Sequence, residues 1–285
     1  MKLTQLWKED HIILGIETEQ GIVDVPAEAA RRGVTAPATM LGAILAGEEG
    51  MAVLCELAQG AQCFAERKPA PVVTGCDKIL CIGLNYRQHA RECNLPLPPA
   101  PVLFNKFSNA LAADGECVYL DPTYREYDYE AELVAVIGKP ARNVSEEEAL
   151  SYVFGYTCGN DLSTRDLQFA RSNQWLLSKT FDGFAPIGPC VVTADVLDPN
   201  DLAISSAVNG ELRQNSRTSD MIFSLAQIIA DLSKHFTLLP GDLIFTGTPQ
   251  GVMHGYPADK KNWMKPGDRV DITIEGIGTL NTTFR

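Results

Sequence analysis

The stretch YDYEAELVAVIG, residues 127–138, decides the fold expected for this chain. Its apolar run is typical of a buried β-strand, and two glutamates, Glu130 and Glu132, stand where that run begins. Side chains alternate across a strand, so these two carboxylates should lie side by side on one face. Two bare carboxylates would repel, and one would take up a proton. A hard divalent cation removes that conflict, and oxygen ligation selects Mg²⁺, Mn²⁺ or Ca²⁺ over Zn²⁺.

A third carboxylate follows another apolar run. The segment FGYTCGNDLSTRD, residues 154–166, brings Asp161 to the end of a strand that could neighbour the first. Three carboxylates suit one Mg²⁺ with open coordination positions. Two plainer interpretations stay open: one glutamate faces solvent at a fraying strand end, and Asp161 caps the helical turn STRDLQ.

The chain beyond residue 71 is dominated by short β runs with turn signals between them. They cover residues 78–85, 101–107, 132–138, 153–161, 189–196, 204–214, 242–249 and 269–284, with Asn209-Gly210 as a hairpin turn in the sixth. Helices are expected at 145–153, where Ser145 and Glu148 have capping-box spacing, and at 219–236, which carries one apolar stripe. The pattern predicts a β-rich α+β domain.

The N-terminal region has a different character. A β-hairpin is expected around Gly21, then an Ala-rich helix over 48–67. The prolines of KPAPVV, residues 68–73, indicate a linker. We therefore expect a small N-terminal α/β domain at 1–71 and a main domain at 72–285.

Composition excludes several classes of partner. The 24 Lys and Arg residues against 36 Asp and Glu give a formal net charge of −12, which argues against nucleic acid and anionic membranes. Charges interrupt every apolar stretch near the N-terminus, so neither a signal peptide nor a membrane anchor is predicted. The eight cysteines form no C-x-x-C pair, and a cytoplasmic protein with reduced thiols is expected.

His89 and Glu92 lie three residues apart in NYRQHARE, residues 85–92. On a helix they would share one face, and the carboxylate would orient the imidazole as in a general base that activates water. A lone histidine is more often structural, so this interpretation needs support from elsewhere in the chain.

That support comes from a resemblance. Six motifs, GLNYRQHARE, DYEAELVAVIGK, GYTCGNDLSTRDLQ, LSKTFDGFAPIGP, VNGELRQNSRTSDMIFS and LLPGDLIFTGTPQGV, occur in the order and at roughly the spacing of the fumarylacetoacetate hydrolase family. Over about residues 77–285 the chain resembles its bacterial acylpyruvase and 2-hydroxyhepta-2,4-diene-1,7-dioate isomerase branch. The resemblance implies a mixed β-sandwich roll, a homodimer, and Mg²⁺ or Mn²⁺ held by Glu130, Glu132 and Asp161.

The resemblance also implies roles for other residues. Lys179 and Arg165 would help hold an anionic substrate at the metal, and Gln168 and Thr248 would position it. His89 and Glu92 would form the water-activating dyad. From the residues alone, Arg165 could instead pair with Asp166 or a glutamate, and Lys179 could lie on the surface.

The implied activity is Mg²⁺-dependent cleavage of a carbon–carbon bond in a small 2-oxo acid, an acylpyruvate or a fumarylpyruvate-like compound, through a metal-stabilised enolate. Oxaloacetate decarboxylation and 2-oxo acid tautomerisation or isomerisation on the same site are alternatives, as is a non-catalytic metal-stabilised binding protein. The segment MHGYPADKKNW, residues 253–263, departs from the glycine that many relatives carry, and with His254 it leaves the substrate tail open.

Overall fold

The computed structural model of the protein describes residues 1–64, 68–170 and 174–285. In this part of the chain the strands form an eleven-stranded sheet, a five-stranded sheet and a two-stranded ribbon. The large sheet runs in the order β4-β3-β2-β1-β13-β11-β10-β16-β5-β6, with β7 beside β13, and the smaller one in the order β15-β14-β17-β18-β8. The expected strand-rich α+β fold is confirmed.

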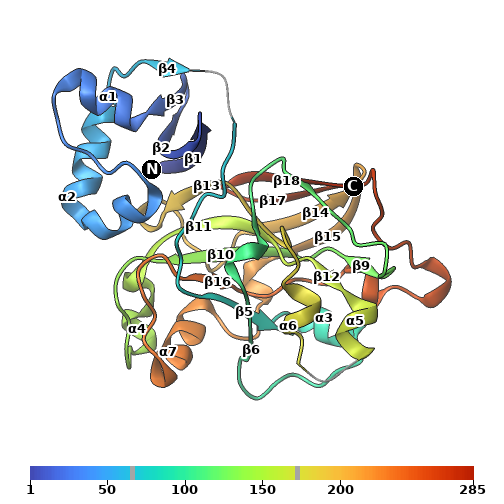
Figure 1. Cartoon of the computed structure of the whole chain (residues 1–285). Helices are drawn as coiled ribbons and strands as arrows, with labels where there is room; N and C mark the ends of the chain where they lie inside the picture. Colours follow the sequence, from blue (N-terminus) through green and yellow to red (C-terminus); the bar gives the residue numbers. More distant parts are fainter. Residues whose placement is uncertain (65–67, 171–173) are drawn as a thin grey trace.

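The N-terminal lobe lies above the rest of the molecule in Figure 1. It holds β1 (Lys2–Lys8), β2 (His11–Thr18), β3 (Gly21–Asp24), α1 (Val25–Arg32), α2 (Met40–Ala58) and β4 (Cys63–Phe64). The antiparallel β2–β3 pair confirms the hairpin predicted around Gly21. The range of α2 contains a break at Gly47, whose φ of 57° and ψ of −145° are not helical. Its first part begins at Met40, where Thr39 caps it by accepting from the Gly42 N–H, and its second part follows the break, where the helix predicted over 48–67 was expected to start. The predicted end is wrong, because the helix stops at Ala58. The last three residues of that prediction, 65–67, lie outside the described residues.

The two parts of the chain share one sheet, because β1 pairs with β13 (Ala185–Thr193). The segment 68–73 runs beside β1: Leu6 bridges to Pro69, and the Ala70 N–H donates to the Gln5 carbonyl at 3.0 Å. Residues 72 and 73, both valines, are fully buried. This segment is therefore packed, and the division into domains at residue 71 stays a prediction.

The central strands carry the site. β10 (Ala131–Ile137) is buried along its whole length and lies between β11 (Val153–Asn160) and β16 (Leu243–Phe245), which explains its continuous apolar run. The sheet continues through β5 (Ile79–Gly83) to β6 (Val102–Lys106). The antiparallel β10–β11 pair sets Ala131 opposite Asn160 and Glu132 opposite Gly159, so the start of one strand meets the end of the other.

The five-stranded sheet packs on β10, β11 and β13 and closes the core. It consists of β8 (Cys117–Val118), β14 (Ala203–Val208), β15 (Glu211–Arg217), β17 (Arg269–Ile274) and β18 (Gly278–Phe284). The β14–β15 hairpin turns at Asn209-Gly210 as predicted, both with positive φ. The short strands are β7 (Leu111–Ala112), β9 (Tyr127–Asp128) and β12 (Ser163–Thr164).

The helices gather at two ends of the main lobe (Figure 1). α4 (Glu146–Ala149) and α7 (Leu225–His235) pack together, while α3 (Arg87–Glu92), α5 (Arg165–Ala170) and α6 (Leu176–Lys179) surround the ends of the central strands. α7 starts six residues later than predicted, at a capping box of Ser224 and Gln227. The predicted capping box of Ser145 is not formed, because its hydroxyl donates to the Glu148 carboxylate at 3.3 Å instead. No helix among the described residues is long and apolar enough to cross a membrane.

Candidate active site

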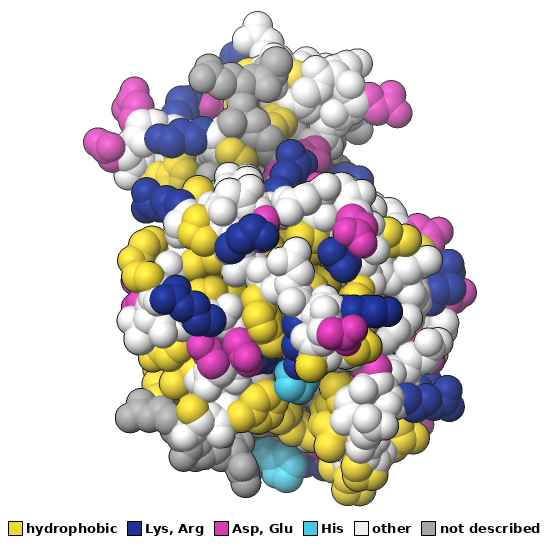
Figure 2. All heavy atoms as spheres, turned by 90° about the vertical axis from the view of Figure 1, so that its right-hand side faces the viewer, with side chains coloured by type: hydrophobic (Ala, Val, Ile, Leu, Met, Phe, Trp, Pro, Cys, Tyr) yellow, Lys and Arg dark blue, Asp and Glu magenta, His cyan; other side chains and the backbone are white. Residues whose placement is uncertain are grey.

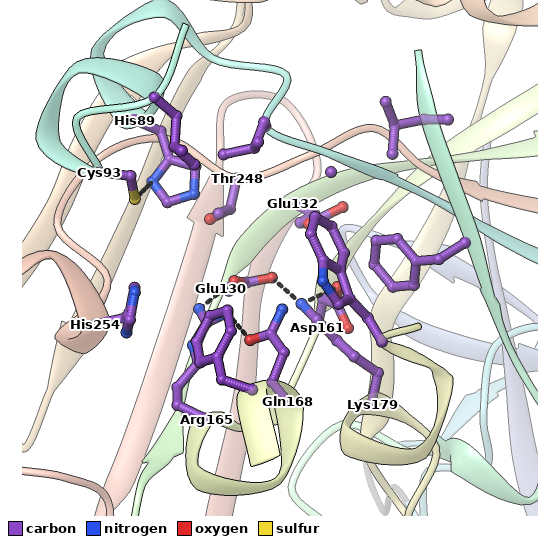
Figure 3. A pocket seen from close by; sticks show the side chains of 17 residues that line it. His89, Cys93, Glu130, Glu132, Asp161, Arg165, Gln168, Lys179, Thr248 and His254 are labelled. Atoms are coloured by element: carbon purple, nitrogen blue, oxygen red, sulfur yellow. Dashed lines mark hydrogen bonds and ion pairs between the residues drawn. The ribbon is translucent and has the colours of Figure 1, made fainter. Parts of the chain in front are cut away.

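Three buried carboxylates meet where β10 begins and β11 ends. Glu130 immediately precedes β10, Glu132 is its second residue, and Asp161 follows β11, with its N–H donating to the Glu130 carbonyl at 3.0 Å. One ligand oxygen from each lies within 4.8 Å of the others (Figure 3). All three side chains are buried. The interpretation of a glutamate exposed at a fraying strand end is therefore wrong, and Asp161 contacts lysines instead of capping a turn.

Two buried lysines form ion pairs with this group. Lys179, on α6, places its Nζ 2.6 Å from Glu130 Oε2 and 2.8 Å from Asp161 Oδ2. It is buried, so the interpretation as a surface lysine is wrong. Lys106, the last residue of β6, places its Nζ 2.6 Å from Asp161 Oδ1 and donates to the Leu162 carbonyl at 3.1 Å. The sequence reasoning missed Lys106; its signal was a lysine inside the apolar run PVLFNKF.

Arg165 is the first residue of α5, and its guanidinium donates hydrogen bonds to three side chains. Nε donates to Asp128 Oδ2 at 2.9 Å, Nη1 to Gln168 Oε1 at 2.9 Å, and Nη2 to Glu130 Oε1. Of the two pairings that the residues alone left open, the one with Asp166 is wrong, since that carboxylate accepts from the Arg125 N–H, and the one with a glutamate is confirmed by Glu130. Asp128, also missed, accepts from the backbone N–H groups of residues 253 and 254 as well, at 2.7 and 3.0 Å. Asp128 therefore connects Arg165 to the loop that contains residues 253 and 254.

The electrostatics of the group fit a divalent cation. Burial, Asp161 and Glu130 raise the pKa of Glu132 well above its usual range, so an added positive charge nearby would favour the ionised form of this carboxyl. Burial opposes ionisation of Glu130 too, but Lys179 and Arg165 hold its pKa at about 2. Glu132 Oε2 also accepts from the Gly247 N–H at 2.8 Å. A buried set of oxygen donors with one surplus negative charge suits a hard ion such as Mg²⁺ or Mn²⁺.

The predicted dyad lies on α3, beside the carboxylates. His89 Nδ1 lies 2.8 Å from Glu92 Oε1, and the Sγ of Cys93, a residue the sequence reasoning did not single out, lies 3.9 Å from the same nitrogen. The Gly251 N–H donates to both oxygens of Glu92, at 3.2 and 3.0 Å. Burial lowers the pKa of His89, but Cys93 and Glu92 outweigh it and raise that pKa to about 9.

Thr248 and Gln168 also line the cavity. Thr248 follows β16, and its hydroxyl oxygen accepts from Gln214 Nε2 at 2.7 Å. Gln168 is held through its Oε1 by Arg165, which leaves its amide nitrogen on the cavity side in Figure 3. The structure thus brings all nine residues predicted for the site together. Their roles stay predictions.

The cavity between α3, α5 and α6 has a volume of about 240 Å³. Beside the charged and polar residues, the cavity has an apolar lining made of Ile82, Leu84, Leu95, Phe104, Phe169 and Trp175. Gly83 makes room for Trp175, since a Cβ there would overlap the indole ring. His254 closes the far end, half-buried, with its ring centroid 5.2 Å from that of Phe169. Figure 2 shows hydrophobic side chains gathered around histidines on the face that carries α3 and α5.

Known proteins share this architecture. Residues 78–285 match the family described as fumarylacetoacetate (FAA) hydrolase C-terminal. The chain is 48% identical over 223 residues to a fumarylacetoacetate hydrolase domain-containing protein 2 homolog of Dictyostelium discoideum, covering 74% of this chain and 72% of that protein. It is 44% identical over 211 residues to a mitochondrial oxaloacetate tautomerase of Xenopus laevis, covering 73% and 66%.

A solved structure is similar over the whole chain. Maleylpyruvate hydrolase from Sphingobium sp. SYK-6, in complex with manganese(II) and pyruvate, superposes with a TM-score of 0.79 at 29% identity, covering 100% of this chain and 98% of that one. The profile match, the curated relatives and this structure agree with the motifs of the sequence. The chain belongs to the fumarylacetoacetate hydrolase family.

Proposed function

We propose that this chain is a divalent-metal-dependent enzyme that interconverts the keto and enol forms of oxaloacetate. The observation that carries the proposal is the placement of a proton-carrying pair, His89 and Glu92, in one cavity with three buried carboxylates. The similarity to the oxaloacetate tautomerase of Xenopus laevis supports it.

Glu130, Glu132 and Asp161 would hold the ion, which would supply Lewis-acid polarisation of the 2-oxo acid. The charges of the site then favour a small anion. Four buried carboxylates, these three and Asp128, face three cations, Lys106, Lys179 and Arg165. A divalent ion would reverse that deficit of one positive charge to an excess of one, while protonated His89 and the carboxylate of Glu92 offset each other. A net positive site complements an anionic 2-oxo acid such as oxaloacetate.

The dyad suits proton exchange at carbon. With its pKa near 9, His89 holds a proton at neutral pH, and Glu92 keeps Nδ1–H engaged, so exchange takes place at Nε2. In the direction of ketonisation the Nε2–H bond breaks and a C3–H bond forms, while the enol hydroxyl returns its proton to solvent. The reverse step takes a proton from C3 and restores the imidazolium. One group therefore performs both directions.

Hydrolysis of an acylpyruvate, the activity first expected from the sequence, is the second candidate. The apolar wall around Trp175 and Phe104 favours it, because a C4 acid such as oxaloacetate leaves that wall uncovered. The similar maleylpyruvate hydrolase structure holds pyruvate, the product such a cleavage releases. In this reaction the dyad would activate water, which needs His89 in its neutral form.

The test separates the two reactions in one experiment. Metal-stripped protein is incubated with oxaloacetate in D₂O, and separately with acetylpyruvate, with and without Mg²⁺ or Mn²⁺, and followed by proton NMR. Metal-dependent deuterium exchange at C3 of oxaloacetate, lost in His89→Ala but kept in His11→Ala on the exposed start of β2, supports the tautomerase. Metal-dependent release of pyruvate and acetate without accelerated exchange would make the hydrolase the function instead. The homodimer stays a prediction for light scattering to test.

A further inference from the structure

A second set of possible metal ligands lies on α3, apart from the three carboxylates. His89 Nδ1, a Glu92 oxygen and Cys93 Sγ lie within 4.8 Å of one another. His89 and Cys93 are four residues apart in sequence, so they share one face of a helical turn, a spacing that lets two side chains bind one ion. We propose that these three side chains form a site for Zn²⁺ or another thiophilic divalent ion, and that its occupation switches the dyad off. The inhibitory consequence rests on the proposed function, whereas the binding site does not.

The present distances are close to those that an ion would need. Tetrahedral Zn²⁺ with bonds of about 2.05 Å to nitrogen, 2.3 Å to sulfur and 2.0 Å to oxygen sets the nitrogen about 3.6 Å from the sulfur and about 3.3 Å from the oxygen. In the structure His89 Nδ1 lies 3.9 Å from Cys93 Sγ and 2.8 Å from Glu92 Oε1. The sulfur would move inward by about 0.3 Å and the carboxylate outward by about 0.5 Å, which side-chain rotation supplies.

The carboxylate ligand is already held in place. The Gly251 N–H donates to both oxygens of Glu92, and a Cβ at Gly255 would lie 2.6 Å from its carboxyl carbon, so the loop packs directly on the side chain. An ionised carboxylate accepts about four hydrogen bonds, so these contacts leave lone pairs for an ion. Glu92 and Cys93 are only partly buried, which leaves a path for the ion.

The two sites differ in the ions that they select. The carboxylate site offers only oxygen, which favours Mg²⁺ and Mn²⁺. The α3 cluster adds a thiol and an imidazole, which favour Zn²⁺. Both can therefore be filled at once, with Zn²⁺ acting on the dyad while the Mg²⁺ site stays occupied.

Occupation would stop proton exchange for a chemical reason. His89 Nδ1 faces Glu92 and Cys93, so Nε2 lies on the other edge of the ring (Figure 3). A neutral imidazole that binds Zn²⁺ through Nδ1 keeps its proton on Nε2, and that nitrogen then has no lone pair to accept a proton from C3. Donation of the proton that it keeps would leave an imidazolate instead of a neutral ring, so ketonisation would stop as well. Glu92, engaged with the ion, no longer accepts from Nδ1. Binding therefore releases two protons to solvent, the thiol proton of Cys93 and the proton on His89 Nδ1.

The experiment titrates the Mg²⁺-saturated protein with Co²⁺ and with Zn²⁺. In the wild type, Co²⁺ should produce a thiolate-to-metal absorption band that saturates at one equivalent. The control Cys55→Ser, which changes an exposed cysteine of α2, should show the same band. Cys93→Ser should show no band. Zn²⁺ should inhibit the wild type and Cys55→Ser at concentrations at least tenfold lower than Cys93→Ser, each relative to its own uninhibited rate. A Co²⁺ band or a Zn²⁺ sensitivity in Cys93→Ser equal to that of the wild type would refute the proposed site.

Two further measurements keep the proposal open to refutation. Glu130→Gln, which removes a proposed ligand of the carboxylate site, should keep the Co²⁺–thiolate band; its loss would show that the band depends on the carboxylate site and overturn the inference of a separate site. In the wild type, Zn²⁺ should protect Cys93 from alkylation by iodoacetamide, read by peptide mass spectrometry, and unchanged alkylation would count against the site even if Cys93→Ser failed to fold. A protein without tautomerase activity that still showed the band would refute the proposed function alone.

Discussion

Replacing Lys106 with Met tests whether the lysine on β6 supports the carboxylate site. Its Nζ lies 2.6 Å from Asp161 Oδ1, and both side chains are fully buried, so the substitution leaves a buried carboxylate oxygen and the Leu162 carbonyl without this partner. Breaking a buried ion pair by removing one partner costs about 3–5 kcal/mol. At about 3 °C per kcal/mol, the Tm of metal-free protein should fall by roughly 10 °C.

Mg²⁺ should restore part of the Tm lost in Lys106→Met, because the negative charge of Asp161 is no longer balanced by Lys106 and attracts a cation more strongly. If the ion binds about tenfold more tightly, Mg²⁺ adds about 1.4 kcal/mol more stabilisation to the variant than to the wild type, or roughly 4 °C. Differential scanning calorimetry with and without Mg²⁺ measures both effects. Lys260→Met, at an exposed lysine, is the control. A Tm loss no larger than that of Lys260→Met, or an equal Mg²⁺ shift in variant and wild type, would refute the reasoning.

Three other changes have expected outcomes. His89→Ala should lower the rate of C3 proton exchange by about 10²-fold while keeping the Mg²⁺-induced rise in Tm, since a base or acid contributes in that range; an unchanged rate would remove His89 from the mechanism. Because folding raises the pKa of His89 from 6.5 to about 9, its protonation stabilises the folded state fully below pH 6.5, and that stability is lost as the pH rises through 9. Urea unfolding at pH 6 and pH 10 should therefore show a loss of about 3 kcal/mol that His89→Ala lacks, and equal losses in both proteins would contradict the shift. Gly83→Ala should displace the Trp175 ring and raise the KM for acids with apolar tails more than the KM for oxaloacetate. Gly210→Ala, in the β14–β15 turn, should leave both KM values unchanged.

The carboxylates were predictable because their placement follows from local geometry. Glu130 and Glu132 share a face through the two-residue repeat of a strand, and Asp161 joins them because β11 is antiparallel to β10. Lys106 and Asp128 were missed because their partners, Asp161 and Arg165, come from other elements, and no short-range pattern encodes the register that brings those elements together.

Helix limits were less predictable than strands for a related reason. Met221 and Ile222 continue the apolar stripe of α7, and a helical period therefore includes them. In the structure Met221 bridges to Tyr86, and the Ile222 N–H donates to the Asn85 carbonyl at 2.7 Å. These contacts fix the start of the segment that carries His89. Tertiary pairing at the site thus takes residues that helix propensity alone would assign to α7.

Asp128 connects the metal-binding carboxylates to the His89–Glu92 dyad, so we expect these two parts of the site to act together. One of its oxygens accepts from Arg165, which holds Glu130, and the same carboxylate accepts from the N–H groups of residues 253 and 254. That loop begins at Gly251, whose N–H holds Glu92. Hydrogen bonds, together with the backbone from Gly251 to residue 254, therefore connect the metal-binding carboxylates to the dyad without passing through the substrate. Each bond involves a buried or charged group, where an unpaired partner is costly, so we expect a shift at Glu130 to change the position of His89.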